Sequence, residues 1–168
     1  MSLTEFTAWT GWPLGVLGLL LALGAFAYVR RQPAGNEAMR DWGGQIQHGA
    51  NAFLRRQSMV LAGFIVVAAL LLWPTASLAT AGAFALGAAT GLAVGWVSVL
   101  AATRANVRTA EAARVAGEGP ALRVAFGGAS VAGLTVAALA LLGLGGLYFG
   151  LVYVQGVYLP EEFARFGE

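Results

Sequence analysis

The sequence predicts an all-α integral membrane protein with about four transmembrane helices. Of its 168 residues, 58% are hydrophobic and only 11% are charged, and the mean hydropathy is +0.72. A soluble domain carries about 25% charged residues. The charges also leave intervals that are long enough for four crossings, since one helical crossing needs about 20 apolar residues. Composition and spacing therefore indicate the same class.

The composition also excludes several kinds of chemistry. The chain has no cysteine, which excludes disulfides and thiolate sites for metals or catalysis. Its net charge is +2, but the basic residues lie beside apolar segments and form no stripe, so we expect no nucleic-acid partner. The lipid bilayer is the expected partner.

The first predicted crossing covers residues 11–29, with Pro13 suited to the first helical turn. A signal peptide is the competing interpretation. However, the positive charge of Arg30 and Arg31 follows the apolar run and does not precede it, and no small-residue cleavage pattern comes after it. The pattern favours a retained helix.

The next two crossings form a predicted hairpin. Residues 58–103 contain no charge, and Trp73, Pro74, Thr75 and Ser77 supply a break in the middle, because proline disfavours helix in the residue before it. We expect helices at about 36–73 and 76–104. The fourth helix is expected at about 121–147, and its end is the least defined boundary.

The arginines predict the orientation by the positive-inside rule. Residues 30–57 and 104–123 are expected to be cytoplasmic, because they carry Arg30, Arg31, Arg40, Arg55 and Arg56, and Arg104, Arg108, Arg114 and Arg123, respectively. Both ends of the chain are expected outside. The segment before residue 11 has Glu5 and no arginine, and the tail has Glu161, Glu162, Glu168 and Arg165.

An amphipathic stretch precedes the second crossing. Asn36 is expected to cap its helix, with Glu37 in the first turn. Its apolar face consists of Met39, Trp42, Ile46, Ala50 and Phe53, and its polar face of Arg40, Gln47, Asn51 and Arg55. Periodicity leaves two alternatives equal: an extension that protrudes from the bilayer, or an interfacial helix on the lipid surface.

Glycines at four-residue intervals mark the third crossing. Gly87, Gly91 and Gly95 form a smooth ridge that predicts close packing against another helix. The alternative is a narrow substrate path lined by backbone. A looser repeat in the fourth helix contains Gly127, Gly128, Gly133 and Gly143.

Side chains that could carry chemistry are few. The predicted crossings contain no acidic residue, histidine or lysine, although such residues usually mark an ion path. His48 has no second ligand at metal-binding spacing. Salt bridges to Arg108 and Arg114 account for Glu111 and Glu118. Arg104 and Arg108, one turn apart, are expected to anchor the helix to lipid headgroups.

The order of residues in three segments resembles the N-terminal region of the membrane-integral, ion-pumping inorganic pyrophosphatases. These segments are "GQIQHGANAFLRRQ" at 44–57, "RANVRTAEAAR" at 104–114 and "ALRVAFGGASVAGLTVAALALLGL" at 121–144. The first family motif corresponds to Gly49, Ala50, Phe53, Leu54, Arg56 and Gln57, and the second to Ala105, Asn106, Arg108, Thr109 and Ala110. The chain departs from the family at Ser58, where tyrosine is usual, at Gly127, where arginine is common, and around Val97 and Ser98, where Gly-Met is expected.

The resemblance implies the first four helices of a sixteen-helix, homodimeric pump that couples pyrophosphate hydrolysis to proton or sodium transport. The family's Mg²⁺ and pyrophosphate ligands begin on the fifth helix, so the resemblance assigns no catalytic or metal residue to this chain. We therefore expect an N-terminal portion that is inactive alone and that depends on the remaining helices of the pump. A noncatalytic scaffold from the same ancestor and an unrelated small transporter are the alternatives.

Overall fold

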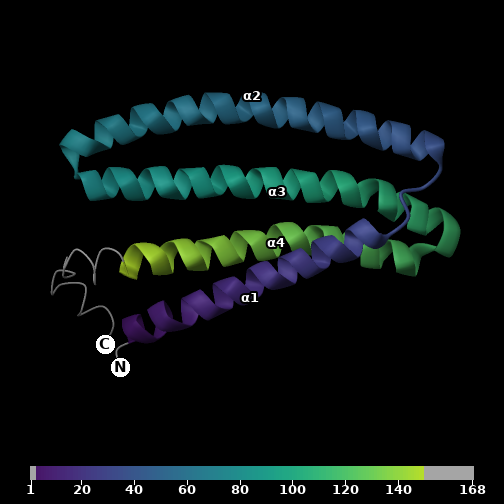
Figure 1. The fold of residues 1–168 in the computed structure, drawn as a ribbon, viewed down its shortest axis with the longest axis horizontal. Coiled ribbons are helices and arrows are strands. Elements are labelled where there is room, and N and C mark those ends of the chain that lie inside the picture. The colour runs from purple at the N-terminus through teal and green to yellow at the C-terminus, as the bar shows by residue number, and fades with distance from the viewer. Residues whose placement is uncertain (1–2, 150–168) are drawn as a thin grey trace.

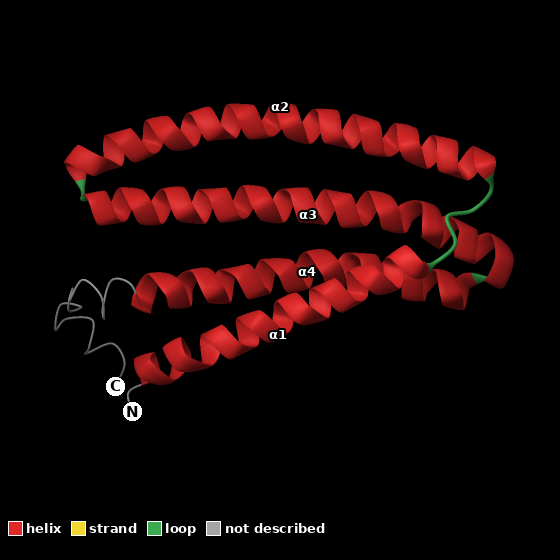
Figure 2. Cartoon of the chain, viewed as in Figure 1, coloured by secondary structure: helices red, strands yellow, loops and turns green. Residues whose placement is uncertain are grey.

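The described part of the protein is a set of four α-helices. The structure, a computed structural model, describes residues 3–149. They form α1 (Leu3–Arg31), α2 (Glu37–Thr75), α3 (Leu78–Ala116) and α4 (Glu118–Phe149), as Figure 1 shows. Within these residues there is no strand (Figure 2). The tail charges Glu161, Glu162, Arg165 and Glu168 lie outside the described residues.

All four helices are long and apolar enough to cross a membrane, as the sequence predicted. The chain is therefore a multi-pass membrane protein. Helices α2 and α3 each have 39 residues, which is about 58 Å at 1.5 Å per residue. A bilayer core is about 30 Å thick. One end of each must then extend beyond the core, and in α3 this is the part after Thr103, where the charges begin.

Helix continues further around the turn between α3 and α4 than the sequence predicted. Residues 104–123 were expected as a segment between helices, but α3 runs on to Ala116 and α4 begins at Glu118. Only Gly117 separates them, with a φ of 84°, which glycine adopts without steric cost. The physical reason is local. Residues 104–116 are mostly alanine, arginine and other residues compatible with helix, so the helix persists until a residue with positive φ ends it.

The turn between α2 and α3 confirms the predicted hairpin, with its break slightly later than expected. Helix α2 continues through Pro74 to Thr75, whose hydroxyl donates to the carbonyl oxygen of Leu71 at 2.7 Å. A proline in the last turn interrupts only one backbone hydrogen bond, so the helix tolerates it. Ser77 then caps α3, since its Oγ accepts a hydrogen bond of 3.0 Å from the backbone N–H of Thr80.

The start of α2 also agrees with the sequence. Asn36 caps the helix, and its Oδ1 accepts a hydrogen bond of 3.0 Å from the backbone N–H of Met39. Because α2 is one continuous helix from Glu37 to Thr75, the structure favours a protruding extension over a separate interfacial helix. The largest apolar residues of this extension, Trp42 and Phe53, are 66% and 64% exposed.

The helices lie side by side in the order α2, α3, α4, α1 (Figure 1). Helix α4 packs against both α1 and α3, and α3 packs against α2. Buried residues concentrate on α4, where Val124, Val131 and Ala138 are at most 2% exposed. Helices α1 and α2 are therefore the two edges of the row, and α4 contributes more buried hydrophobic residues than any other helix.

Candidate functional site

The first family motif lies on α2, and one of its residues anchors α2 to α3. Leu54 is buried, with 6% of its surface exposed. Ala50 is half-buried, and the other members are exposed: Gly49, Phe53, Arg56 and Gln57. Most of this motif therefore faces away from the described helices.

A groove runs between α2 and α3 beside this motif. Leu54 and Gln57 line it together with Phe64 and with Gly91 and Gly95 of the glycine ridge. Within this groove the indole Nε1 of Trp96 donates a hydrogen bond of 2.9 Å to the hydroxyl of Ser58. Ser58 occupies the position where the family usually has tyrosine, and its hydroxyl accepts this hydrogen bond from Trp96 of the facing helix.

The second family motif lies on α3 and faces α4 and α1. Ala105 is 4% exposed, and Gly128 of α4 lies so near that a side-chain carbon at Gly128 would overlap the Cβ of Ala105. Asn106 and Ala110 are exposed. The hydroxyl of Thr109 is buried and has no hydrogen-bond partner among the described residues. The motif therefore allows α3 and α4 to pack closely, because each helix has a small residue at the contact, Ala105 on α3 and Gly128 on α4.

Arg108 of this motif ties α3 to the end of α1. Its Nε donates to the backbone carbonyl oxygen of Gln32 at 3.1 Å, and its Nη1 donates to that of Arg104 at 2.9 Å. The guanidinium lies beyond the charge-free part of α3. Its pKa is lowered, first by burial and then by the positive charges of Arg104 and Arg30.

Residues at the end of α1 also contact this part of α3, and no pattern in the sequence predicted that contact. The guanidinium carbon of Arg104 lies 5.4 Å from the centre of the Phe26 ring, and that of Arg30 lies 6.0 Å from it. Both distances are within the range of cation–π attraction. Phe26 and Arg30 are four residues apart on α1, which suggests that they share a face. Nothing in the sequence indicates that this face meets α3.

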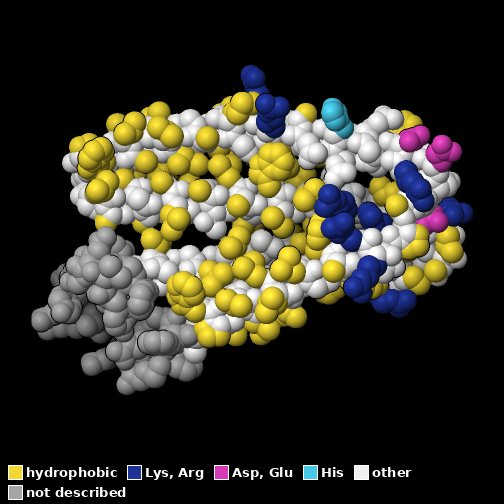
Figure 3. Space-filling model, in the orientation of Figure 1, with side chains coloured by type: hydrophobic (Ala, Val, Ile, Leu, Met, Phe, Trp, Pro, Cys, Tyr) yellow, Lys and Arg dark blue, Asp and Glu magenta, His cyan; other side chains and the backbone are white. Residues whose placement is uncertain are grey.

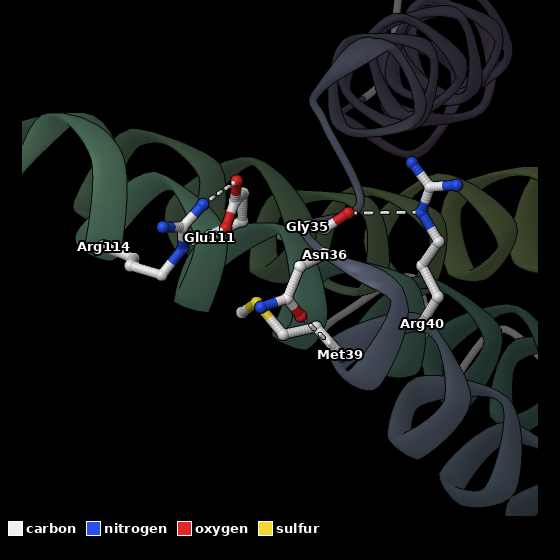
Figure 4. Close-up of polar contacts among 6 residues, drawn as sticks. All are labelled: Gly35, Asn36, Met39, Arg40, Glu111 and Arg114. Carbon is white, nitrogen blue, oxygen red and sulfur yellow. Dashed lines mark hydrogen bonds and ion pairs between the residues drawn. The ribbon is translucent and has the colours of Figure 1, made fainter.

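Glu111 forms an ion pair on α3 itself (Figure 4). Arg114 donates two hydrogen bonds of 2.8 Å to its carboxylate, and these bonds lower the pKa of Glu111 below its ordinary value. The expected role of Arg108 as a salt-bridge partner was wrong, because Arg108 turns to the backbone of Gln32 instead. Glu118 forms no ion pair within the described residues and lies in the first turn of α4, where negative charge is favourable.

The glycines that pack closely are not those of the predicted ridge. At Gly87, Gly91 and Gly95 an added Cβ would meet no atom within 4 Å in the described part of the chain. At Gly15 and Gly18 of α1, in contrast, it would lie 2.6 Å from the side chain of Leu142 and 3.0 Å from that of Ala138. Packing of the ridge against a helix stays a prediction, and no helix in residues 3–149 fulfils it.

Residues that could hold a metal do not cluster in the described part of the chain. Among its residues, no three histidine, aspartate or glutamate side chains come together. His48 is exposed on α2, in a shallow groove beside Asn51 and Arg55. The first family motif meets α3 through Leu54, and the second meets α4 and α1. Within residues 3–149 the two motifs therefore take part in two different helix junctions.

Comparison with known proteins decides the family. The model of the family described as "Inorganic H+ pyrophosphatase" matches residues 16–167. This chain belongs to that family. The K(+)-stimulated pyrophosphate-energized sodium pump of Thermotoga maritima is 44% identical over 133 residues, which are 79% of this chain and 18% of the pump. The K(+)-insensitive pyrophosphate-energized proton pump of Methanosarcina mazei is 37% identical over 136 residues, 80% of this chain and 20% of the pump.

A third relative extends the match. The K(+)-insensitive pyrophosphate-energized proton pump of Pyrobaculum aerophilum is 36% identical over 157 residues, or 90% of this chain and 21% of the pump. The chain thus spans about a fifth of the length of the curated relatives that it matches. Relatives named for sodium and for proton transport both match, so similarity over this region does not separate the two ions.

Proposed function

We propose that this chain forms the first four helices of a membrane pyrophosphatase that couples pyrophosphate hydrolysis to proton or sodium translocation. The observation that carries the proposal is the extent of the match. In the pump of Pyrobaculum aerophilum the alignment covers 90% of this chain but only 21% of the pump. We infer that the chain supplies structural support and that the transport chemistry depends on the remaining helices of the pump.

The faces that the described helices leave uncovered support this role. Gly87, Gly91 and Gly95 have open space around them, and Trp42 and Phe53 on the α2 extension are largely exposed. Small residues allow close approach between membrane helices. We propose that the remaining helices of the same pump, which the matched relatives possess, cover the ridge and the extension. In its full-length form the pump is expected to be a homodimer.

Metal dependence is characteristic of pyrophosphatases in general, and we propose Mg²⁺ as the ion. A magnesium ion that binds phosphates is held by one or more carboxylates and supplies charge stabilisation to the reacting oxygens. The described residues do not fit such a site. Glu111 is held by Arg114. Glu37 and Glu118 lie in the first turns of α2 and α4, and Asp41 lies one turn further along α2. We therefore propose that the metal ligands lie in segments of the pump that this chain does not contain.

Two measurements test this proposal. Purified alone with Mg²⁺, the 168-residue chain should not hydrolyse pyrophosphate above the background of an empty-vector membrane preparation. Co-expressed with the remaining helices of a related pump, it should restore Mg²⁺-dependent hydrolysis. Hydrolysis by the chain alone would contradict the assignment of the site to other segments. Failure to complement, with the chain folded in the membrane, would favour the noncatalytic scaffold.

The proposed orientation places residues 30–57 and 104–123 in the cytoplasm and both termini outside. The chain has no cysteine, so single cysteines report on topology without background. Cysteines that replace Thr4 and Gly167 should react with a membrane-impermeant maleimide added to intact cells. Cysteines that replace Gly35 and Gly117 should react only after the membrane is permeabilised. Labelling of the Gly117 variant in intact cells would overturn the orientation.

A further inference from the structure

Three arginines from two helices meet where α1 ends against α3. Arg30 lies in the last turn of α1, and Arg104 and Arg108 lie one turn apart on α3. The guanidinium groups of Arg30 and Arg104 approach the same aromatic ring, that of Phe26, at 6.0 Å and 5.4 Å. Arg108 is held beside them by its hydrogen bonds to the carbonyl oxygens of Gln32 and Arg104. Neither helix alone could assemble this group, which we call the arginine junction.

The arginine junction has no negative partner in the part of the chain that the structure describes. The ion pair found there joins Arg114 to Glu111, further along α3. Burial, and after it the positive charges of Arg104 and Arg30, lower the pKa of Arg108. Because like charges at short range destabilise one another, three unpaired guanidinium groups favour the binding of an anion. Figure 3 shows the wider setting, with the basic side chains gathered over one half of this face of the molecule.

The geometry indicates what kind of anion fits. A guanidinium that lies on an aromatic ring keeps its N–H groups available at its edge, and these match the oxygens of a phosphate in a planar, bidentate manner. No hydrogen bond of the Arg30 or Arg104 guanidinium is found within residues 3–149, whereas Arg108 is held by two carbonyl oxygens. Arg30 and Arg104 therefore have donors to offer, and Arg108 adds charge from a fixed position.

The position of the arginines along their helices indicates which sources of phosphate can reach the arginine junction. Arg104 is the first charged residue after the uncharged interval 58–103, and Arg30 is the first after the interval 11–29. Both lie at the boundary between the apolar and the charged parts of their helices, where lipid headgroups and dissolved anions are both within reach. We propose that Arg30, Arg104 and Arg108 form a binding site for one phosphate group, from either an anionic lipid headgroup or free phosphate.

A discrete site differs from general attraction between arginines and the membrane surface. General attraction acts on every exposed arginine near the headgroups, so the loss of any one should have a similar effect. A discrete site depends on the residues that converge at Phe26. Arg55, which is exposed on α2, provides the matched control, because it carries the same charge at a place away from Phe26.

The experiment measures the thermal unfolding midpoint of the 168-residue chain in neutral detergent with phosphatidylcholine. One arm adds sodium phosphate against sodium chloride at equal ionic strength, and the other adds phosphatidic acid or phosphatidylglycerol. We expect at least one arm to raise the midpoint in a saturable manner. Stabilisation by the lipid alone identifies the headgroup as the source, and stabilisation by phosphate alone identifies the free anion.

Variants link the effect to the arginine junction. Arg104→Gln and Arg30→Gln should each weaken the apparent affinity about tenfold, whereas Arg55→Gln should leave it unchanged. If Arg104→Gln does not fold, Arg104→Lys keeps the charge and should still weaken binding, because lysine lacks the planar pair of donors. The proposal is overturned if neither source stabilises the chain, or if Arg55→Gln weakens binding as much as Arg104→Gln.

Discussion

The two edges of the helix row pack in opposite ways. At one edge, α1 meets α4 through Gly15 and Gly18, which lie directly against Leu142 and Ala138. At the other edge, α2 and α3 contact each other but leave a groove between them, lined by Phe64, Gly91 and other residues. Both edges are rich in small residues. At the second edge Gly43 of α2 lies against Val107 of α3, but an added Cβ at Gly87, Gly91 or Gly95 would meet no atom within 4 Å in the described part of the chain.

This difference teaches that a glycine ridge does not identify its own partner. In lipid, apolar surface alone gives helices little reason to associate, so close contact depends on backbones that can approach each other. The α1 and α4 pair achieves this contact with residues of this chain. The α3 ridge offers the same small surface, and within residues 3–149 an added Cβ there meets no atom within 4 Å, which leaves room for the close approach of another helix.

The largest expected loss of stability in the isolated chain comes from a larger side chain at the edge where α1 packs closely on α4. In Gly15→Leu, the new side chain meets Leu142 and the carbonyl oxygen of Ala138, which lies 3.1 Å from the position of an added Cβ. Overpacking of this kind costs about 1–3 kcal/mol of unfolding free energy. Unfolding in mixed micelles measures this loss. Gly24→Leu is the control, because Gly24 is on the same helix with no neighbour within 4 Å, and an equal loss there would contradict the comparison.

A larger side chain on the glycine ridge of α3, at the edge formed by α2 and α3, should have an effect only when the remaining helices are co-expressed. Gly91→Leu should change the unfolding free energy of the isolated chain by less than about 0.5 kcal/mol, because an added Cβ there meets no atom within 4 Å and the side chain can extend into the groove between α2 and α3. In co-expression with the remaining helices it should reduce complementation of pyrophosphate hydrolysis severely, since the new side chain separates the backbones. Gly91→Ala should retain most of the activity. Full activity of Gly91→Leu would show that the ridge faces lipid.

A smaller loss of stability is expected when the hydrogen bond between α2 and α3 is removed. Loss of the bond from Trp96 to Ser58, in Ser58→Ala or Trp96→Phe, should reduce the unfolding free energy by about 1 kcal/mol. The two substitutions should not add in the double variant, because each removes the same bond. Unfolding of all four proteins in mixed micelles gives the coupling. Full additivity would show that the bond contributes nothing to the contact of α2 with α3.

The smallest effect concerns the pH dependence of the pair of Glu111 and Arg114. The pKa of Glu111 is lowered in the folded chain, so its contribution to stability is present above the ordinary carboxyl pKa. That contribution is lost as the pH falls through the lowered value. Glu111→Gln should flatten this part of the stability profile, measured by thermal unfolding from pH 7 downward. Glu118→Gln is the control. An equal change in its stability profile would show that the effect does not come from the ion pair of Glu111 and Arg114.

Much of the fold follows from residues that are close in sequence. The charge-free intervals predicted four apolar helices, and the caps Asn36 and Ser77 mark helix starts because their side chains accept bonds from N–H groups three residues on. The break near Pro74 predicted the hairpin for the same local reason. The continuation of α3 to Ala116 was missed, because charged residues were interpreted as a connecting segment although they are compatible with helix.

The candidate site shows where local information ends. The two family motifs could be located in the sequence, but their neighbours could not. That Ala105 rests on Gly128, and that Arg108 reaches the carbonyl oxygen of Gln32, follows only from the order in which the helices lie. Periodicity indicates which residues share a face of one helix, and it does not indicate which helix that face meets.

The sequence by itself determined the membrane class, the four helices and the concentration of arginines at one end of the apolar segments, because each of these depends on composition and on spacing along the chain. Only the tertiary structure decided that α1 packs on α4, that Gly15 and Gly18 lie in close contact with α4, and that Arg30 and Arg104 share the ring of Phe26. The physical reason is that contacts between membrane helices depend on the shapes of two surfaces together, and each segment of sequence describes only one of them.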